Sequence, residues 1–253
     1  MNTQTRVAQT EASVDEERAE RPRPPRKSQF VRFLFFKVDP AWRHRDEKKR
    51  HDDKSQFAAV VDRFAERMFV QPYSTVGTRA DTDIALVLAT YRLEDLQEMQ
   101  TELLSTSLGA FVSLPYSYLA MTRRSMYIGK HHEHEGQDGV RMVIRPGTAK
   151  YLFVYPFVKT RAWYALSFEE RQRMMTAHIT LGHQYPGVRI NTTYSFGLDD
   201  QEFVVSFDAD SPEEFLDLVM KMRETAASSY TLRDTPVFTC LTMDIRQALN
   251  TVG

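Results

Sequence analysis

The sequence has one cysteine, Cys240, and no surplus of charge, because 33 Lys and Arg residues stand against 34 Asp and Glu residues. One cysteine excludes an intrachain disulfide and a metal site built from several thiolates. Balanced charge argues against nucleic-acid binding, which needs a surplus of cationic side chains for the phosphates. No apolar run approaches the roughly 18 residues of a membrane span, and no apolar secretory core follows the N-terminus. We therefore expect a cytoplasmic protein with no membrane span and no nucleic-acid partner.

Residues 1–28 lack leucine, isoleucine and every aromatic residue, and charged residues and prolines crowd the second half of this segment. Such a segment cannot bury enough apolar surface to offset the entropy that ordering costs, so we predict a disordered tail. Its basic stretch, Arg21–Lys27, is either a solvated part of that tail or a contact for an acidic partner.

The rest of the chain contains an internal duplication. The apolar stretch Phe30–Lys37 resembles Tyr151–Lys159, and both are predicted to be strands because aromatic and β-branched residues dominate them. Each stretch is followed by a tryptophan, Trp42 or Trp163, and then by apolar residues at helical spacing. These helical residues are Phe57, Val60, Val61, Phe64 and Met68 in the first copy and Met174, Met175, His178 and Leu181 in the second.

Both copies continue with the same order of elements. A turn rich in glycine and aspartate leads to a strand, a second amphipathic helix follows, and a final strand closes the copy. The resulting order of strand, helix, strand pair, helix and strand defines a ferredoxin-like repeat, here present twice. We predict an α+β protein whose two antiparallel sheets pack face to face or close into one barrel, with helices outside. The predicted inner and closing strands are Ile84–Leu88, Tyr116–Met121, Glu202–Phe207 and Val237–Met243.

This pattern divides the chain into four segments. The tail, residues 1–28, precedes an N-terminal repeat at 29–127, a connecting loop at 128–147 and a C-terminal repeat at 148–253. The connecting loop is rich in glycine, and long loops within compact domains are often functional.

One polar residue, His178, interrupts the apolar face of its helix. Ser167 and Glu170 have the spacing of a capping box, which predicts where this helix begins and therefore the face on which His178 lies. A neutral histidine in this place is either a hydrogen-bonded core residue or a ligand of haem iron. His183 lies on another face, and we expect it to be solvated.

Five stretches of the C-terminal copy resemble one known family. They are Tyr155–Tyr164, Ser167–Arg171, Met174–His178, Tyr194–Asp200 and Met222–Ser228. Together they resemble the chlorite dismutase family, which includes the coproheme decarboxylases, the peroxide-dependent haem synthases. The resemblance implies two ferredoxin-like repeats that form a dimeric α+β barrel type domain, in agreement with the duplication.

The resemblance also implies roles for individual residues. His178 occupies the place of the family's proximal iron ligand. Tyr155 matches the tyrosine that is thought to form a radical and to take a hydrogen atom from a propionate, with a core aromatic residue as the alternative. Lys159 matches a basic residue that helps to orient a propionate.

Further matches surround the expected porphyrin. Arg223 and Ser228 match a propionate-binding pair, and Arg141 matches a further propionate-binding arginine, with a surface arginine as the alternative. Trp163 matches a tryptophan that packs against the haem. Glu224 is placed to receive the N–H of the proximal imidazole, as a carboxylate that raises the basicity of the ligand.

The sequence departs from the family at the distal position. Oxygen-producing chlorite dismutases place an arginine there and many decarboxylases a glutamine, whereas this chain has Ile190. Arg189 is its neighbour, but strand alternation directs it to the opposite face. Isoleucine cannot stabilise an anionic oxychlorine intermediate, which disfavours chlorite dismutation. Some decarboxylases with an apolar residue here use a loop histidine to deprotonate peroxide, and His134 or His132 is the candidate base. The alternatives are a solvated loop and a separate metal site.

The residues and the family resemblance together predict a haem-dependent oxidoreductase, a coproheme decarboxylase. Its substrates are iron-coproporphyrin III and hydrogen peroxide, two propionates become vinyl groups, and the product is haem b. The resemblance implies a homo-oligomer, commonly a pentamer, and a transient contact with a coproporphyrin ferrochelatase. The alternatives are a chlorite dismutase, which Ile190 disfavours, and a haem-binding carrier or sensor without turnover.

Overall fold

The computed structural model describes residues 28–127 and 142–253 of the chain. The predicted tail lies almost wholly outside the described residues, and so do Arg141, His132 and His134.

Two copies of the predicted element order are present. The first consists of β1 (Phe30–Val38), η1 (Pro40–His44), α2 (Glu47–Ala65), β2 (Phe69–Ser74), β3 (Ile84–Thr90), α3 (Leu93–Ser105), η2 (Leu108–Phe111) and β4 (Val112–Met121). The second consists of β5 (Tyr151–Lys159), α4 (Arg161–Ala165), α5 (Phe168–Gly182), β6 (Val188–Tyr194), β7 (Phe203–Ala209), α6 (Pro212–Arg223), η3 (Ala226–Tyr230), β8 (Thr231–Arg233), β9 (Phe238–Thr242) and α7 (Ile245–Asn250).

The strands of the two repeats join into one antiparallel system. The nine-stranded sheet has the order β7-β6-β4-β1-β3-β2-β9-β5-β8, and an additional pairing of β7 with β5 closes it. Each closing strand pairs with a strand of its own repeat and also with one of the other repeat: β4 with β6 of the second copy, and β9 with β2 of the first. Of the two arrangements predicted from sequence, the closed barrel is therefore correct, and the α+β fold with two ferredoxin-like repeats is confirmed.

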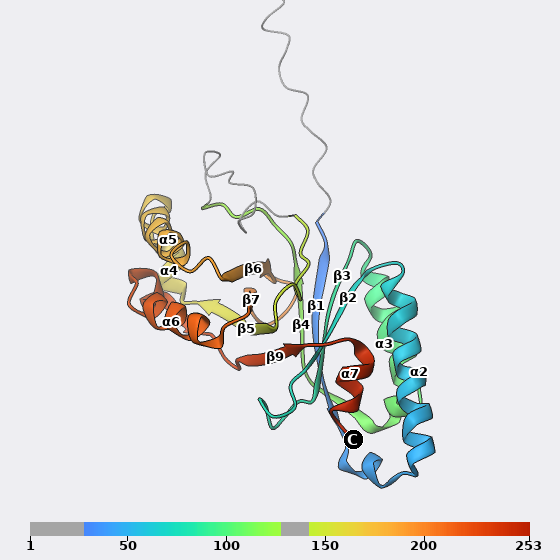
Figure 1. Cartoon of the computed structure of the whole chain (residues 1–253). Coiled ribbons are helices and arrows are strands. Elements are labelled where there is room, and N and C mark those ends of the chain that lie inside the picture. Colours follow the sequence, from blue (N-terminus) through green and yellow to red (C-terminus); the bar gives the residue numbers. More distant parts are fainter. Residues whose placement is uncertain (1–27, 128–141) are drawn as a thin grey trace, which may run out of the picture.

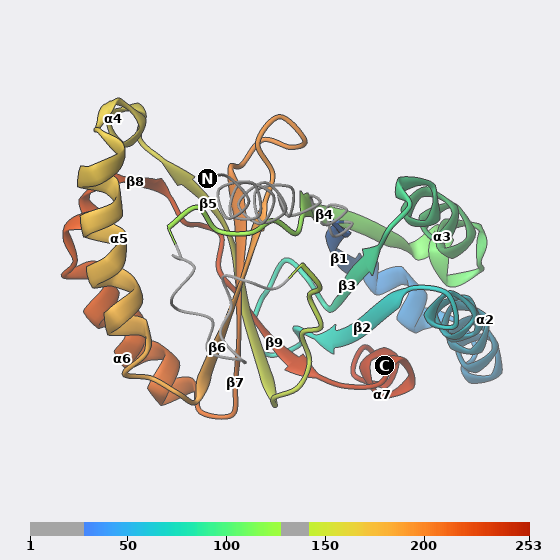
Figure 2. The same cartoon turned by 90° about the horizontal axis from the view of Figure 1, so that it is seen from above.

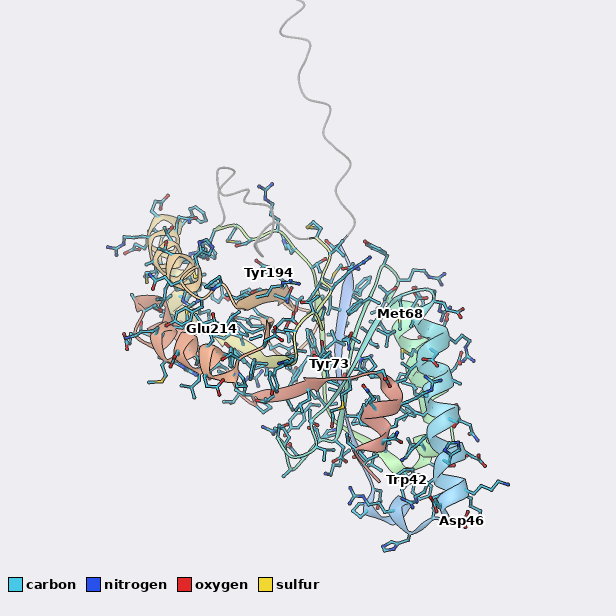
Figure 3. All side chains as sticks on the ribbon, viewed as in Figure 1. Trp42, Asp46, Met68, Tyr73, Tyr194 and Glu214 are labelled. Atoms are coloured by element: carbon cyan, nitrogen blue, oxygen red, sulfur yellow. The ribbon has the colours of Figure 1, made fainter. Side chains whose placement is uncertain are left out.

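Side-chain alternation on β5 separates two cores. Leu152 and Val154 point into an interior cluster drawn from strands of both repeats, whereas Phe153 and Tyr155 belong to a second cluster that includes residues of α6. Tyr73, fully buried in the interior cluster, lies between the two groups of helices in Figure 3.

The helices lie outside the barrel on opposite sides. Figure 1 shows α2, α3 and α7 beside the sheet of the first repeat and α4, α5 and α6 on the far side, and the view from above in Figure 2 shows the same two groups. None of the helices in the two described ranges has both the length and the apolarity that a membrane span requires.

The two groups of helices differ in how they contact the sheet. Helix α2 buries its predicted apolar face, with Phe57, Val61 and Phe64 nearly inaccessible to solvent. The matching face of α5 stays half-buried, and Gly182 is the one residue of α5 that is buried. An apolar face that contacts the sheet so little is suited to a large apolar ligand.

Strand β8 and helix α7 are among the short elements that were not predicted from the sequence. Strand β8 adds to the end of β5, and α7 begins at a capping box of Asp244 and Gln247 before packing against α2. Both are too short to show a recognisable hydrophobic periodicity, and they are stabilised by tertiary contacts.

Candidate functional site

Helix α5 begins where the sequence predicts. The backbone N–H of Glu170 donates to Oγ of Ser167 at 3.2 Å, and the N–H of Ser167 donates to Oε2 of Glu170 at 3.1 Å. This reciprocal cap satisfies two N–H groups that have no partner within the helix. The helix then runs to Gly182, which places His178 on the half-buried face and leaves His183 exposed, as predicted.

The imidazole of His178 is held in its neutral form. Burial, together with the positive charge of Lys159, lowers the pKa of His178 from 6.5 to about 4. A neutral imidazole retains a lone pair on one ring nitrogen, which is the form that binds iron.

The partner of this imidazole is Thr225, not Glu224. Nδ1 of His178 lies 3.4 Å from Oγ1 of Thr225, whose own hydroxyl donates to the carbonyl of Met222 at 2.7 Å. Since its proton is used in that bond, the Thr225 oxygen accepts from Nδ1–H, and the lone pair remains on Nε2. The carboxylate of Glu224 instead lies 3.3 Å from Nζ of Lys221 at the surface. The sequence-based placement of Glu224 beside the imidazole therefore differs from the structure.

Lys159 is a buried cation at the end of β5. Its ammonium donates to the carbonyl of Ala227 at 2.6 Å and lies 4.7 Å from the centroid of the Trp163 ring. Burial lowers the pKa of Lys159 to about 8, with an opposing contribution from Glu202. A positive charge is thus held between β5 and η3, close to the imidazole of His178.

Glu202 organises the backbone around Lys159. Its Oε2 accepts from the N–H of Lys159 at 2.8 Å and from the hydroxyl of Tyr164 at 2.6 Å. The carboxylate therefore ties the start of β7 to the end of β5 and to helix α4. Sequence reasoning missed this role, although a buried acid at the start of an otherwise apolar strand was a visible signal.

Tyr155 lies on the barrel face that α5 and α6 cover. Its ring stacks on that of Phe207, with centroids 5.8 Å apart. Burial raises the pKa of Tyr155 well above its ordinary value, and the negative charge of Asp234 adds to this effect while Arg223 opposes it. The phenol is accordingly neutral throughout the physiological range and lies within electrostatic reach of an arginine.

Arg223 and Ser228 stand beside this face on neighbouring elements. Arg223 ends α6 and forms an ion pair with Asp234, and Ser228 is half-buried in η3. Sequence reasoning identified Arg223 but not its partner, because Asp234 follows a short strand whose position only the tertiary fold defines.

Ile190 occupies the same face from β6. It belongs to the partly buried residues packed with Tyr155 and Met222, and a Cβ built on Gly182 would lie 3.6 Å from its Cδ1. Arg189 pairs in register with Asp208, whereas Ile190 pairs with Phe207 of the helix-covered face. The two neighbours point to opposite faces, as strand alternation predicts.

Three sequence-predicted residues, His132, His134 and Arg141, lie outside the described residues. Just before them in the chain lies Tyr127. Its carbonyl accepts a hydrogen bond from Nε2 of Gln172 at 2.8 Å, and the Tyr127 ring stacks on that of Phe168 with centroids 6.1 Å apart. These contacts attach the chain at Tyr127 to the first half of α5.

The closed two-repeat barrel is matched by known proteins. The family model described as chlorite dismutase matches residues 50–243. The chain belongs to the chlorite dismutase family. A coproheme decarboxylase of Mycolicibacterium smegmatis is 33% identical over 168 residues, which cover 66% of this chain and 70% of the relative.

Solved chlorite dismutases share the fold of this family member. A mutant chlorite dismutase from Candidatus Nitrospira defluvii superposes with a TM-score of 0.81 at 20% identity, covering 88% of this chain and 94% of the other. The enzyme from the same organism in complex with imidazole gives a TM-score of 0.80 at 20% identity, with coverages of 88% and 94%.

The side chains of this chlorite dismutase family protein fit a haem. The neutral imidazole of His178 projects from α5, and the surface of the helix around it is apolar and half-buried. Within the described ranges no group of three or more His, Cys, Asp or Glu residues gathers as a metal site. Arg223, whose side chain is 55% exposed, supplies a cation that a carboxylate group of a porphyrin could reach.

Proposed function

We propose that this protein is a coproheme decarboxylase, which uses hydrogen peroxide to convert two propionates of iron-coproporphyrin III into the vinyl groups of haem b. The observation that carries the proposal is the position of Tyr155, a neutral phenol that packs in the cluster lined by α6 and lies within electrostatic range of Arg223. A tyrosine beside a carboxylate-binding cation is the arrangement that oxidation of a propionate needs. The 33% identity to a coproheme decarboxylase supports the same assignment.

The roles of the residues follow from their chemistry. His178 would hold the iron through Nε2, since Nδ1–H is engaged by Thr225. Arg223, Ser228 and Arg141 bind propionates, Trp163 packs against the macrocycle, and Lys159 orients a propionate. Bound iron porphyrin supplies the oxidising chemistry with peroxide, and the protein supplies placement and electrostatics. Tyr155 would relay the oxidation: peroxide at the bound iron porphyrin would accept two electrons per propionate, one of them through Tyr155 as it takes a hydrogen atom from the propionate side chain, and the second would leave with carbon dioxide as the vinyl group forms.

The distal base is part of the proposal. Ile190 has no polar atom with which to take a proton from peroxide, so we assign this step to His134, with His132 as the alternative. Both residues lie outside the described ranges, and the alanine variants His134→Ala and His132→Ala separate them. If peroxide reacts at an unchanged rate in both variants, the loop has no part in the reaction.

We extend the proposal to the setting of the enzyme. The family resemblance supports a homopentamer in the cytoplasm and a transient contact with a coproporphyrin ferrochelatase that delivers the substrate. Size determination in solution tests the subunit number, and exchange of coproheme between the two purified proteins tests the contact.

The deciding experiment titrates the apoprotein, loaded with ferric coproheme, against hydrogen peroxide and follows the extracted porphyrin by mass spectrometry. We expect conversion through a monovinyl intermediate to haem b, abolished in Tyr155→Phe. Tyr151→Phe is the matched control, because Tyr151 lies on the same strand and contacts the same cluster. Bleaching without loss of carbon dioxide in the unmodified protein contradicts the proposal.

The same preparation tests the two alternatives. Chlorite-dependent oxygen release identifies a chlorite dismutase, which Ile190 disfavours. Retention of haem b after purification, together with no reaction on coproheme, identifies a carrier.

A further inference from the structure

Arg223, the predicted propionate ligand, already has a carboxylate partner within the chain. Its Nη2 forms an ion pair with Oδ2 of Asp234, which follows β8. The two side chains differ in exposure: that of Asp234 is 19% exposed and that of Arg223 is 55% exposed. The aspartate therefore holds the guanidinium from the protein side, while the guanidinium remains accessible from outside.

This ion pair lies within electrostatic range of the phenol of Tyr155. The charges of Asp234 and Arg223 both act on Tyr155, in opposite directions. The Asp234 carboxylate thus occupies the kind of position that a substrate carboxylate needs: bound to Arg223 and within electrostatic range of Tyr155.

We propose that Asp234 takes the place of a substrate propionate on Arg223 when no substrate is bound, and that the propionate displaces it. The inference rests on the proposed function, because it concerns the substrate carboxylate that Arg223 binds. When that propionate has lost its carboxylate as carbon dioxide, Asp234 pairs with Arg223 again. Asp234 is therefore a specificity residue that responds to the number of carboxylates on the porphyrin.

The energetics allow this exchange. Because the guanidinium is 55% exposed, the ion pair contributes little, and a second carboxylate can replace the first on it; the cost of the exchange is that Asp234, 19% exposed, then lacks its partner. In the product, a vinyl group replaces the propionate, so Arg223 has lost the substrate carboxylate. Without Asp234, it would then be a cation with no compensating charge, within electrostatic range of a buried phenol. The aspartate thus weakens substrate binding by competition and favours the product state by pairing the cation.

The test measures equilibrium binding of ferric coproheme and of haem b to the full-length apoprotein, followed by absorbance of the porphyrin and quenching of tryptophan fluorescence. Asp234→Asn keeps the size of the side chain and removes its charge. We expect coproheme to bind about two- to fivefold more tightly to this variant, the range that loss of a solvent-accessible ion-pair competitor predicts. Haem b is expected to bind with unchanged or lower affinity.

Two controls isolate the ion pair. Asp217→Asn makes the same change of charge at an exposed position of α6, and we expect it to leave both affinities unchanged. In an Arg223→Gln background, Asp234→Asn is expected to lose its effect, because the two residues act as a pair. Circular dichroism and thermal unfolding establish that each variant is folded.

The outcomes separate the two proposals. If the unmodified protein does not bind coproheme, both the proposed function and this inference fall. If coproheme binds but Asp234→Asn leaves its affinity unchanged or lowers it, the proposed function stands and this inference is overturned, since Asp234 then serves only to position Arg223. Equal tightening by Asp217→Asn also overturns it, because net charge alone explains that result.

Discussion

Nδ1 of His178 lies 3.4 Å from the hydroxyl oxygen of Thr225, a residue that follows helix α6 rather than belonging to α5. The contact makes a neutral oxygen, not a carboxylate, the acceptor for the imidazole N–H. A neutral acceptor draws the imidazole proton less strongly than a carboxylate and leaves the ring with less anionic character. The structure therefore predicts an iron ligand of modest basicity.

Replacement of Thr225 tests this contact. In the apoprotein, we expect Thr225→Val to raise the population of the Nε2–H tautomer of His178, because Nδ1–H loses its acceptor. Affinity for ferric porphyrin should fall by up to about tenfold, as for other residues that support a metal ligand. Two-bond proton–nitrogen NMR spectra report the tautomer without any bound porphyrin. Thr225→Ser retains the hydroxyl and is expected to behave as the unmodified protein, and an unchanged tautomer in the valine variant contradicts the assignment.

Removal of His178 tests the axial ligand itself. We expect His178→Ala to lose the absorbance spectrum of histidine-bound ferric porphyrin and to regain it when imidazole is added, because the free base replaces the missing side chain. His183→Ala is the matched control, since His183 is exposed at the end of the same helix. A histidine-type spectrum in His178→Ala without imidazole would show that another residue binds the iron.

Stability should depend on pH through His178. Its folded-state pKa of about 4 lies below the ordinary value of 6.5, so between these values the unfolded chain binds more protons. The free energy of unfolding therefore falls as the pH drops from 7 to 5, by roughly 1–2 kcal/mol for this half-buried group. Urea unfolding at both pH values measures the loss. We expect His178→Gln to remove this part of the loss and His183→Gln to retain it, and equal losses in all three proteins contradict the prediction.

Glu202 should matter for stability more than an ordinary surface acid. Glu202→Ala leaves the N–H of Lys159 and the hydroxyl of Tyr164 without their acceptor, and we expect it to lower the free energy of unfolding by about 2–4 kcal/mol. Tyr164→Phe removes one of the two bonds and should cost about 1 kcal/mol. Both losses are measured from the midpoint of urea unfolding, provided that the dependence of the free energy on urea concentration is unchanged. A midpoint for Glu202→Ala equal to that of the unmodified protein contradicts the prediction.

Local patterns made several features predictable. Period-two alternation on β5 separates Val154 from Tyr155, and the capping box at Ser167 establishes the start of α5, because both depend on residues close in sequence. The same local regularity places His178 on the apolar face of its helix. The internal duplication indicated two ferredoxin-like repeats.

Long-range pairing decided the rest. The sequence did not decide between two packed sheets and one closed barrel. The barrel follows from pairings such as Met121 with Tyr194, which join distant parts of the chain. The partners of the site, Thr225 and Asp234, likewise reach His178 and Arg223 from other elements. Hydrophobic periodicity specifies which face of an element is buried but not which element covers it, and hydrogen bonds between distant residues leave no periodic signal. The sequence by itself thus determined most of the elements, their buried faces and the place of His178 on its helix, whereas the tertiary structure decided which side chains contact His178 and Arg223.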